Sequence, residues 1–395
     1  MSAFKIADNV HWVGVKDPEL AVFDIVMKTE RGTTYNAYLV QGEKTALIDT
    51  AKKEFESEFL ANVEEIIPLE KIDYLIVCHN EPDHSGAMQT VLDRNPNIKI
   101  ICSAPGLPFA RNIINRDADL TGVKDGHEID LGGKTLRCYG MPYMHWPDTM
   151  MVYLPEDKVL FSNDIFAAHI SFDSPWADEA PPEDNFDFEF YYYWDAIMRP
   201  FAGYARRNLK KLDDLDIDII ATSHGPLIRK DIPQFIEKYK EWSRDKAEGR
   251  NLVSVFYISN YGSTTVMAKA LTEELTNLGL EVKAVDMAEI SDDDAKELIE
   301  SSQAILIGTP TFNGDAVEPV WHFTSLLSTV YRLGKKAAVF GSYGWGGEAP
   351  KLVRERLAGL KLKVFEEDLR ARLIPSDNEM TELKEYAGRL AEFLK

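Results

Sequence analysis

Cysteine is scarce in this sequence of 395 residues, which contains only Cys78, Cys102 and Cys138. None of the three belongs to a C-x-x-C pair, so the spacing excludes an iron site of four cysteines within the chain. Each cysteine lies in or beside an apolar run that is typical of a strand. We interpret them as small buried side chains of a protein in a reducing compartment.

Basic residues and long apolar runs are also in short supply. The chain has 44 Lys and Arg against 65 Asp and Glu, and its formal net charge of -21 argues against nucleic acid or an anionic membrane as partner. No apolar run is long enough to span a membrane. The first residues lack the basic and apolar regions of a signal peptide. We therefore expect a cytoplasmic protein with no nucleic-acid partner and no membrane partner.

The remaining composition, with 45% hydrophobic and 28% charged residues, is that of an ordinary globular protein. The length is sufficient for two domains. The order of strand-like and helix-like runs changes near residue 250, so we predict one domain over residues 1–250 and a second over residues 251–395. Short strand-like runs dominate the first domain: Thr34–Val40, Thr45–Asp49, Tyr74–Cys78, Ile98–Cys102, Thr135–Tyr139, Met150–Leu154, Val159–Phe161 and Ile217–Ala221.

Helical periods in the first domain fit Lys53–Ile67, Gly86–Arg94 and Gln234–Lys246, the last with Asp231 as a possible N-terminal cap. The Leu131–Lys134 segment, with two glycines, predicts a hairpin turn. Strands of this kind are buried on both faces when two sheets are covered by helices, so we expect an α/β domain of that type.

The segment His79–Gly86 (sequence HNEPDHSG) is the chemically richest part of the chain. It places two imidazoles and two carboxylates directly after a buried strand, and both groups are ligands of first-row transition metals. If the segment is extended, residues two apart point the same way, so His79 and Glu81 could serve one metal while Asp83 and His84 serve a second. The alternative is a solvated polar turn.

Three further candidates follow other predicted strands: His145, Asp164 and His224. Taken singly, a His or Asp after a strand is more often structural. Together with the His79–Gly86 segment they form a ligand set that belongs to the ends of four strands, and one carboxylate among them could bridge two metals.

This series resembles the metallo-β-lactamase fold, an αββα sandwich whose usual loop reads H-x-H-x-D-H. Glu81 stands where that loop has its second His, and Trp-Pro-Asp follows His145. Both features are similar to the flavodiiron proteins, whose site holds two non-haem iron ions. The resemblance implies His79, Glu81 and His145 on one iron, Asp83, His84 and His224 on the other, and Asp164 as the bridge.

Beyond residue 250, strands and helices alternate strictly, which predicts a doubly wound parallel sheet. The expected strands are Leu252–Ile258, Glu281–Asp286, Gln303–Gly308, Ala337–Phe340 and Leu362–Phe365. The expected helices are Thr264–Leu278, Asp293–Ser301, Pro319–Leu333, Pro350–Leu357 and a last one that begins at the capping box Ser376–Glu379.

The first strand–helix turn of this domain combines hydroxyl groups, a glycine and a helix N-terminus, which favours a phosphate. The dinucleotide fingerprint G-x-G-x-x-G is absent. With two later loops the pattern resembles flavodoxin, which implies that these loops hold FMN. The expected FMN residues are Ser259, Asn260, Tyr261, Gly262, Ser263, Thr264, Pro310, Thr311, Phe312, Asn313, Ser342, Tyr343, Gly344, Trp345, Gly346 and Gly347.

Three residues near the expected metals have less specific patterns. His169 resembles a pocket histidine of the flavodiiron family and is assigned a catalytic role, although it could be a satisfied structural residue. Tyr193 is also assigned a catalytic role, because its run Tyr191–Trp194 could line the substrate pocket; the alternative is core packing. Asp49 is expected to orient a ligand.

The flavodiiron resemblance covers nearly the whole chain. It implies an oxidoreductase that reduces dioxygen to water, nitric oxide to nitrous oxide, or both. Electrons would come from an external donor such as rubredoxin or reduced deazaflavin and pass through FMN. It also implies a head-to-tail homodimer or a dimer of dimers. Two alternatives remain from the sequence: a dizinc hydrolase with a flavodoxin-like regulatory domain, and an electron carrier with a vestigial metal site.

Overall fold

The computed structural model describes residues 2–395 and divides the chain into two compact units. The first unit ends at Ser243, and the second runs from Arg244 to Lys395. The boundary predicted from the sequence, at residue 250, falls inside the second unit. Each unit has its own hydrophobic core. Within residues 2–395, none of the helices combines the length and the apolar content that a membrane crossing requires.

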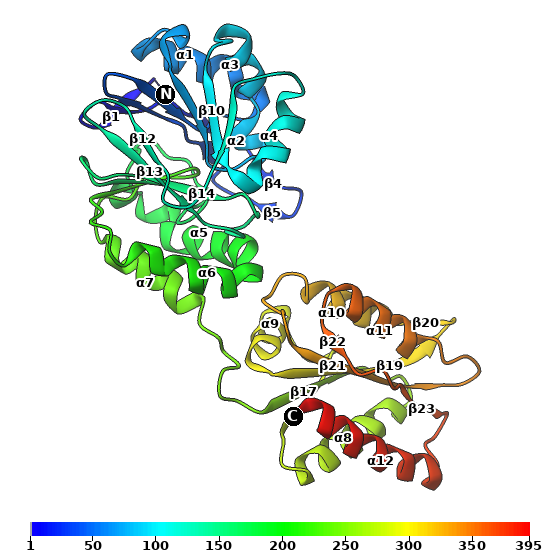
Figure 1. Ribbon diagram of the computed structural model, residues 1–395. Coiled ribbons are helices and arrows are strands. Elements are labelled where there is room, and N and C mark those ends of the chain that lie inside the picture. The colour runs from blue at the N-terminus through cyan, green and yellow to red at the C-terminus, as the bar shows by residue number, and fades with distance from the viewer. Residues whose placement is uncertain (1) are drawn as a thin grey trace. The chain divides into compact units, whose positions relative to one another are not determined.

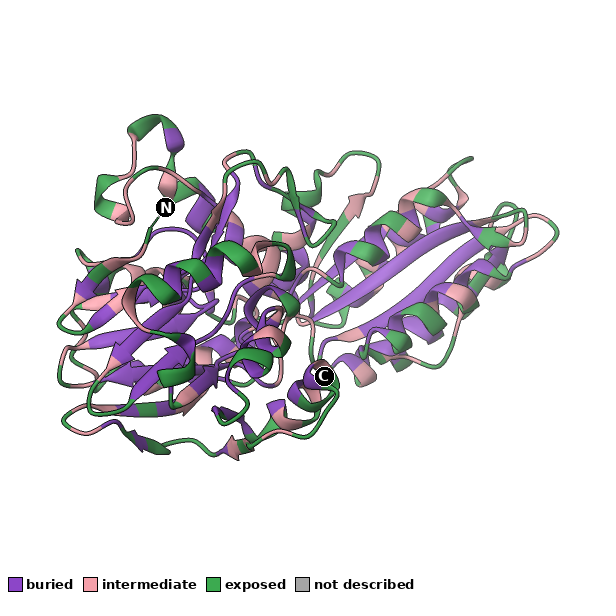
Figure 2. Ribbon diagram, turned by 90° about the horizontal axis from the view of Figure 1, so that it is seen from above, coloured by how far each residue is buried: buried purple, intermediate pink, exposed green. Residues whose placement is uncertain are grey.

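Two β-sheets face each other in the first unit and enclose its core (Figure 1). Ile76 and Cys78 from one sheet pack in the same buried cluster as Val152 and Phe161 from the other. Helices α1, α3 and α4 lie on the outer side of the first sheet, and α5, α6 and α7 lie on the outer side of the second. The predicted αββα sandwich is therefore confirmed. Figure 2 shows that the central strands are buried while the outward faces of the helices are exposed.

The elements of this unit have the following bounds. The first sheet has the order β1 (Phe4–Ala7), β2 (Val10–Trp12), β7 (Tyr38–Gln41), β8 (Thr45–Ile48), β9 (Tyr74–Val77), β10 (Lys99–Ser103) and β11 (Leu120–Val123). The second has the order β12 (Glu128–Asp130), β13 (Thr135–Gly140), β14 (Met150–Leu154), β15 (Val159–Asn163) and β16 (Ile219–Thr222). Two short ribbons pair β3 (Val15–Asp17) with β6 (Thr33–Tyr35), and β4 (Val22–Phe23) with β5 (Met27–Lys28). The helices are α1 (Glu56–Ile66), α2 (Pro82–Ser85), α3 (Met88–Arg94), α4 (Leu107–Ile114), α5 (Phe186–Tyr193), α6 (Ala202–Asn208) and α7 (Ile232–Trp242).

The direction of the strands brings the chemically important loops together. Strands β8, β9 and β10 are parallel to one another in the first sheet. In the second sheet β15 is parallel to β16, and β13 runs the same way because both β13 and β15 are antiparallel to β14. The loops after β13, β15 and β16 therefore leave one edge of their sheet, where a rigid frame can position their side chains.

Asn36 interrupts the run that the sequence predicted as one strand, Thr34–Val40. The structure has two strands there, β6 and β7, and Asn36 lies between them. Its side-chain Nδ2 donates hydrogen bonds to the carbonyl oxygens of Thr222 and Gly225, both at 2.9 Å, while Trp12 Nε1 donates to its Oδ1 at 2.8 Å. The prediction of one strand was wrong. The strand is broken at Asn36 because its buried side-chain amide binds the loop that follows β16 in the second sheet.

Other local predictions also need correction. The Pro82–Ser85 stretch is helical rather than extended, with Pro82 in the first turn, where its missing N–H costs no hydrogen bond. Asp231 does not cap α7 through its side chain, because it adopts a left-handed conformation with φ of 55°. The short strands before residue 30 were not predicted. They are only two to four residues long, which leaves too little periodicity to recognise.

The second unit is a parallel sheet with the order β18-β17-β19-β21-β22, and β23 also pairs with β21. In chain order this is 2-1-3-4-5, the flavodoxin-like doubly wound topology that the sequence predicted. Helices α8 and α12 cover one face, and α9, α10 and α11 cover the other (Figure 1). The strands are β17 (Leu252–Tyr257), β18 (Glu281–Asp286), β19 (Ala304–Phe312), β20 (Asp315–Ala316), β21 (Lys336–Tyr343), β22 (Lys363–Val364) and β23 (Leu369–Arg372). The helices are α8 (Ser263–Asn277), α9 (Asp292–Ser301), α10 (Glu318–Leu326), α11 (Ala349–Gly359) and α12 (Asp377–Leu394).

Two elements of this unit differ from the sequence-based expectation. Helix α10 ends at Leu326 rather than Leu333. Strand β23 was not predicted, because its alternation of Leu, Arg, Ala and Arg is short and follows a run of acidic residues. The capping box at the start of α12 is confirmed, with Ser376 Oγ accepting the Glu379 N–H and the Glu379 carboxylate accepting the Ser376 N–H.

We expect Asn36→Ala to lower the free energy of unfolding of the first unit by about 3 kcal/mol, because it leaves the buried Trp12 Nε1 without its acceptor and removes two hydrogen bonds to the loop of the second sheet. Urea unfolding followed by tryptophan fluorescence measures the change. Gln89→Ala is the control, since it removes an exposed side-chain hydrogen bond in the same unit. Equal effects of the two substitutions would contradict the role of Asn36 as a link between the sheets.

Candidate metal centre and cofactor pocket

The metal-ligand candidates of the first unit form two adjoining groups. One contains His79, Glu81, His145 and Asp164, whose potential ligand atoms all lie within 4.8 Å of one another. The other contains Asp83, His84 and His224 by the same criterion. The structure thus brings together every residue for which the sequence suggested metal binding, in the two sets that were expected.

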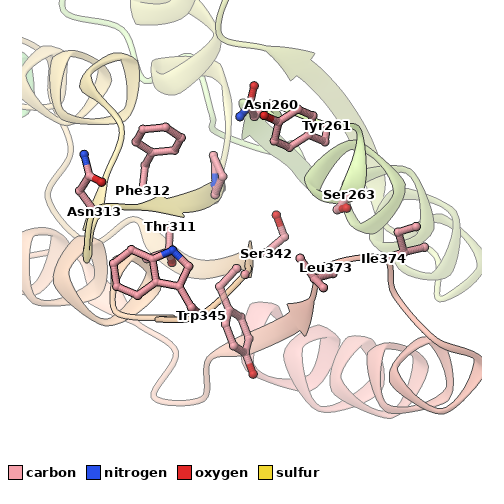
Figure 3. A pocket seen from close by; sticks show the side chains of 13 residues that line it. Asn260, Tyr261, Ser263, Thr311, Phe312, Asn313, Ser342, Trp345, Leu373 and Ile374 are labelled. Atoms are coloured by element: carbon pink, nitrogen blue, oxygen red, sulfur yellow. The ribbon is translucent and has the colours of Figure 1, made fainter.

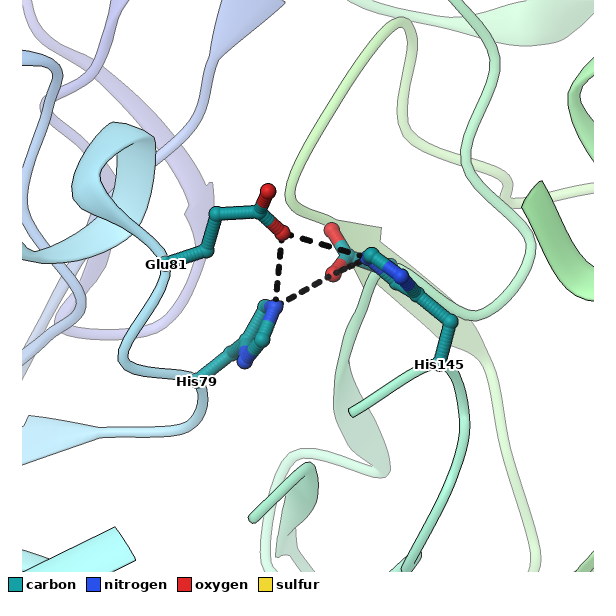
Figure 4. A group of neighbouring side chains, drawn as sticks. His79, Glu81 and His145 are labelled. Atoms are coloured by element: carbon teal, nitrogen blue, oxygen red, sulfur yellow. Dashed lines mark hydrogen bonds and ion pairs between the residues drawn. The ribbon is translucent and has the colours of Figure 1, made fainter. Parts of the chain in front are cut away.

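The first group converges from three loops (Figure 4). His79 Nε2 lies 3.0 Å from Glu81 Oε2. His145 Nε2, from the loop after β13, lies 3.3 Å from the same carboxylate oxygen. The side chains of Glu81 and His145 are each 14% exposed, whereas His79 is completely buried. The group is therefore open to solvent on the side of Glu81 and His145.

The second group is more deeply buried. Its members reach it from α2 and from the loop after β16, with His224 Nε2 at 3.2 Å from Asp83 Oδ2 and His84 Nε2 at 3.4 Å from Asp83 Oδ1. None of these side chains is more than 8% exposed. The short helix α2 explains why Asp83 and His84 can point to one place although they are adjacent in sequence, which an extended segment would not allow.

Asp164 lies between the two groups and presents a different oxygen to each. Its Oδ2 is 3.6 Å from both His79 Nε2 and His145 Nε2. Its Oδ1 is 3.1 Å from His84 Nε2 and 3.4 Å from His224 Nε2. This is the arrangement of a carboxylate that can bridge two metal ions.

Several oxygens in the centre lack hydrogen-bond partners despite these short distances. Among the residues described, neither oxygen of Asp83 accepts a hydrogen bond, and the same is true of Asp164 Oδ2. Buried carboxylate oxygens normally have a partner. Lone pairs that face a shared space with several imidazole nitrogens are suited to divalent cations, so the side chains fit two metal ions.

The electrostatics of the centre also favour cations. Burial raises the pKa of Asp164, but His84 and His145 outweigh this effect and hold it well below its ordinary range. Burial lowers the pKa of His145, but the neighbouring carboxylates of Asp164 and Glu81 outweigh it and raise that pKa to about 10. The carboxylates therefore keep their negative charge. This charge favours either protons on the neighbouring imidazoles or metal ions bound by them.

The ligand candidates are held in place by neighbouring groups. His224 Nδ1 lies 2.7 Å from the carbonyl oxygen of Thr34, so a proton on Nδ1 donates to that carbonyl and leaves Nε2 free for a metal. Ser223 Oγ donates to Asp164 Oδ1 at 2.6 Å. Asp49 accepts from the Cys78 N–H at 2.7 Å and from Asn163 Nδ2 at 3.2 Å. It thereby positions the backbone beside His79 and Asp164.

Asp148 is a supporting residue that the sequence analysis missed. Its Oδ2 accepts hydrogen bonds from both the backbone N–H and the side-chain Nδ2 of Asn80, each at 2.9 Å. Its Oδ1 lies 3.5 Å from His79 Nδ1. The sequence contained a signal for it, since Trp-Pro-Asp follows His145, but nothing in the spacing showed that the carboxylate would turn toward His79.

His169 and Tyr193 lie beside His224 in a buried aromatic group. The His169 ring is 4.9 Å from that of His224 and 5.0 Å from that of Tyr193, and Phe23 packs on it at 4.0 Å. His169 Nδ1 lies 2.8 Å from Thr33 Oγ1, and its Nε2 has no hydrogen-bond partner among the described residues. Burial, reinforced by His224, lowers the pKa of His169 well below its ordinary value, so this imidazole is neutral. Trp194, by contrast, packs with Tyr239 and Trp242 in the core.

The second unit contains a cavity of about 560 Å³ at the carboxyl ends of β17, β19 and β21 (Figure 3). A volume of this size suits a cofactor or other small molecule. Most of the residues predicted to bind FMN line it: Asn260, Tyr261, Ser263, Pro310, Thr311, Phe312, Asn313, Ser342, Tyr343, Gly344 and Trp345.

The other five predicted residues lie in the same loops but not in the cavity wall. Ser259 Oγ accepts a hydrogen bond from the Gly262 N–H at 3.1 Å, and Gly262 has φ of 88° at the start of α8. Thr264 Oγ1 lies 2.9 Å from Ser342 Oγ. Gly346 and Gly347 follow Trp345 and adjoin Glu348. These residues shape the loops.

The cavity has features that match FMN. No side chain caps the first turn of α8, so its backbone N–H groups are available for a phosphate. The hydroxyl of Thr311 is buried without a hydrogen-bond partner among the described residues. Tyr261 and Trp345 are 92% and 79% exposed, which is unusual for aromatic side chains unless a flat ligand covers them.

Leu373 and Ile374 also line the cavity, and the sequence analysis missed them. They follow β23, which itself was not predicted. Apolar residues in a loop carry no signal for a cofactor, so only the pairing of β23 with β21 reveals their place.

Comparisons with known proteins agree with both sites. Residues 33–225 match the model of the ODP family of β-lactamase-like domains, and residues 255–386 match that of flavodoxins. The chain is 37% identical to the flavo-diiron protein FprA2 of Clostridium acetobutylicum, over 99% of this chain and 100% of that protein. It is 33% identical to a nitric oxide reductase of Moorella thermoacetica, over 92% of this chain and 91% of that protein.

Among solved structures, the chain resembles the rubredoxin oxygen:oxidoreductase of Desulfovibrio gigas, with a TM-score of 0.67 and 29% sequence identity. The match covers 100% of this chain and 98% of the other. Full-length similarity, a β-lactamase-like domain with a double metal centre and a flavodoxin domain with a flavin-sized cavity lead to one conclusion. The chain belongs to the flavodiiron protein family.

Proposed function

We propose that this protein is an oxidoreductase that reduces dioxygen to water or nitric oxide to nitrous oxide at a non-haem diiron centre served by FMN. The observation that carries the proposal is Asp164, which directs one carboxylate oxygen to each of two His- and carboxylate-containing groups. Of the similar proteins described above, one is named a nitric oxide reductase and one a rubredoxin oxygen:oxidoreductase.

His79, Glu81 and His145 would hold one iron, Asp83, His84 and His224 the other, and Asp164 would bridge them. Bound FMN and a bound pair of ferrous ions together store four electrons, as reduction of dioxygen to water requires, whereas two nitric oxide molecules require two. A gas would approach from the side of Glu81 and His145, which is the solvent-accessible part of the centre.

We assign His169 and Tyr193 to the buried wall behind His224. Burial raises the pKa of Tyr193 well above its ordinary value, so its hydroxyl stays protonated and can donate a hydrogen bond. The neutral His169 is anchored through Nδ1 to Thr33, and its free Nε2 can form a hydrogen bond with a neighbouring group. Both residues would help to orient the groups that supply protons to either reduction.

The FMN would lie in the cavity of the second unit, with its phosphate at the start of α8 and its ring near Tyr261 and Trp345. An external donor such as rubredoxin or reduced deazaflavin would supply the electrons. Cys78, Cys102 and Cys138 are all buried and unpaired, which suits a reducing compartment, and we therefore propose that the protein works in the cytoplasm.

Anaerobic reduction of the purified protein, followed by separate exposure to dioxygen and to nitric oxide, tests this function. We expect consumption of at least one gas by protein that contains iron and FMN, and the faster reaction identifies the substrate. A zinc-loaded protein that cleaves esters or thioesters and consumes neither gas would support the dizinc hydrolase instead.

The carboxylate of Glu81 distinguishes the two alternatives. We expect Glu81→His to raise the zinc-to-iron ratio and to lower gas consumption by about tenfold or more, because an imidazole is a softer donor without negative charge. FMN content should not change. Metal analysis and gas-electrode assays check this, with the exposed Glu54→His as control. Parent-like iron content and turnover in Glu81→His would disprove the assignment of Glu81.

Asp148 should affect the metal centre without contacting a metal. We expect Asp148→Asn to weaken iron binding by about 10- to 100-fold, because it removes the negative charge that faces His79 Nδ1. Competition with a chelator measures this affinity, and the FMN content serves as an internal reference. Asp130→Asn, an exposed change of the same type, is the control. An unchanged affinity would show that Asp148 has only a structural role at Asn80.

We further propose a head-to-tail homodimer, or a dimer of such dimers, in which the FMN of one subunit serves the iron pair of the other. Exposed apolar side chains support a protein contact at the cavity rim, where Tyr261, Phe312 and Trp345 are each more than half exposed. The same two-fold contact would shield the flavin.

A mixed dimer tests this arrangement. One subunit carries Ser259→Glu and Ser263→Glu, which oppose the phosphate, and the other carries Asp164→Ala. Each homodimer should be inactive, whereas a purified mixed dimer should recover up to about half of the parent activity, because one of two cross-subunit pairs is intact. Mixed dimers that form and contain both cofactors but remain inactive would show that electrons pass within one subunit.

A further inference from the structure

The loop that carries Trp345 is held from outside the flavin cavity by charged side chains. Gly344 and Trp345 line the cavity, and Gly346 and Gly347 complete the turn that leads to α11. Behind this loop lies β23, whose residues Arg370 and Arg372 have no place in the cavity wall.

Both arginines donate hydrogen bonds to carbonyl oxygens of the loop. Arg372 Nε donates to the Gly344 carbonyl at 3.1 Å, and Arg370 Nη1 donates to the Gly347 carbonyl at 3.3 Å. The strand that carries them is fixed in turn, because β23 pairs in parallel with β21 and the Leu373 N–H donates to the Tyr343 carbonyl at 2.8 Å.

Glu348 completes the attachment with the opposite charge. Its Oε2 accepts the Gly347 N–H at 2.7 Å, and this contact together with its own backbone N–H lowers the pKa of Glu348. Gly347 has φ of 147°, a backbone region that favours glycine, and a Cβ at Gly346 would lie 2.2 Å from the Glu348 carboxylate. The turn is thus built around these charged contacts.

The same strand end also forms part of the cavity. Leu373 and Ile374 follow Arg372 directly and line the cavity on the side of Ser263, across from Phe312 and Asn313 (Figure 3). The Arg372 N–H is itself accepted by Glu379 Oε1 at 2.8 Å, which ties it to the capping box of α12. Rotation of this loop would therefore disturb several hydrogen bonds at once.

We propose that Arg370 and Arg372 are positioning residues that hold the Gly344–Gly347 loop, which Glu348 braces at Gly347, in one conformation and thereby favour reduced over oxidised FMN. This inference rests on the FMN site proposed above. A two-electron-reduced flavin ring that has lost its ring proton would be anionic, and two guanidinium groups behind the loop would stabilise it by charge. Their hydrogen bonds also keep the negative ends of the Gly344 and Gly347 carbonyl dipoles directed at β23.

The test compares the affinity of each variant for oxidised and for reduced FMN. In Arg372→Met we expect the ratio of the reduced to the oxidised dissociation constant to rise by about tenfold, with a matching fall in the midpoint potential of the bound flavin. Arg372→Lys retains the charge but not the aligned Nε–H donor, so the ratio should rise by about threefold. Spectroelectrochemical titration of the protein with FMN bound measures both quantities.

Arg389→Met is the matched control, because this arginine lies on the neighbouring helix α12 but pairs with Glu367 rather than with the loop. Its ratio should stay within about twofold of the parent. Parent-like ratios in both Arg372 variants would overturn the proposal, as would an equal shift in Arg389→Met, which would assign the effect to overall charge. Should Arg372→Met fail to fold, Arg372→Lys alone decides. A failure of the FMN site itself is recognised separately, because Ser263→Glu would then leave FMN binding unchanged.

Discussion

The carboxylate of Asp164 is the group on which the metal centre depends. It is buried, it follows β15, and its two oxygens face imidazoles that come from the first sheet, from α2 and from the loops after β13 and β16. A buried negative charge of this kind is costly unless cations surround it. The two sheets must therefore meet at one edge with little freedom, and the hydrogen bonds of Asn36 across that edge supply this constraint.

The sequence revealed the chemistry of the site better than its local geometry. Metal-ligand chemistry shows in residue types and in their position after strands, so the seven ligand candidates could be recognised from the amino-acid pattern, whereas their division between two irons came from the resemblance to the flavodiiron proteins. The extended conformation assumed for the His79–Gly86 segment was partly wrong, since Asp83 and His84 lie in a helical turn. The supporting role of Asp148 was not predicted, because it depends on the direction in which this one side chain points.

For the fold as well, some elements could be predicted from the sequence and others could not. Long elements with clear periodicity, such as α8 and β17, were predicted nearly to their ends. Very short strands were missed, because their pairing is decided by distant partners: β23 forms only against β21, and the ribbon of β4 and β5 holds Phe23 over His169. Leu373 and Ile374 could not be assigned to the cavity for the same reason.

The two metal positions differ in their access to water, and this difference has a consequence for how the centre is assembled and lost. The position of Glu81 and His145 is partly exposed, while that of Asp83, His84 and His224 is closed. An ion at the outer position can exchange with the medium directly, whereas the inner ion must wait for its neighbour to leave or for the protein to open. Filling should therefore proceed from the inside outward, and mixed-metal forms should carry the foreign ion at the outer position.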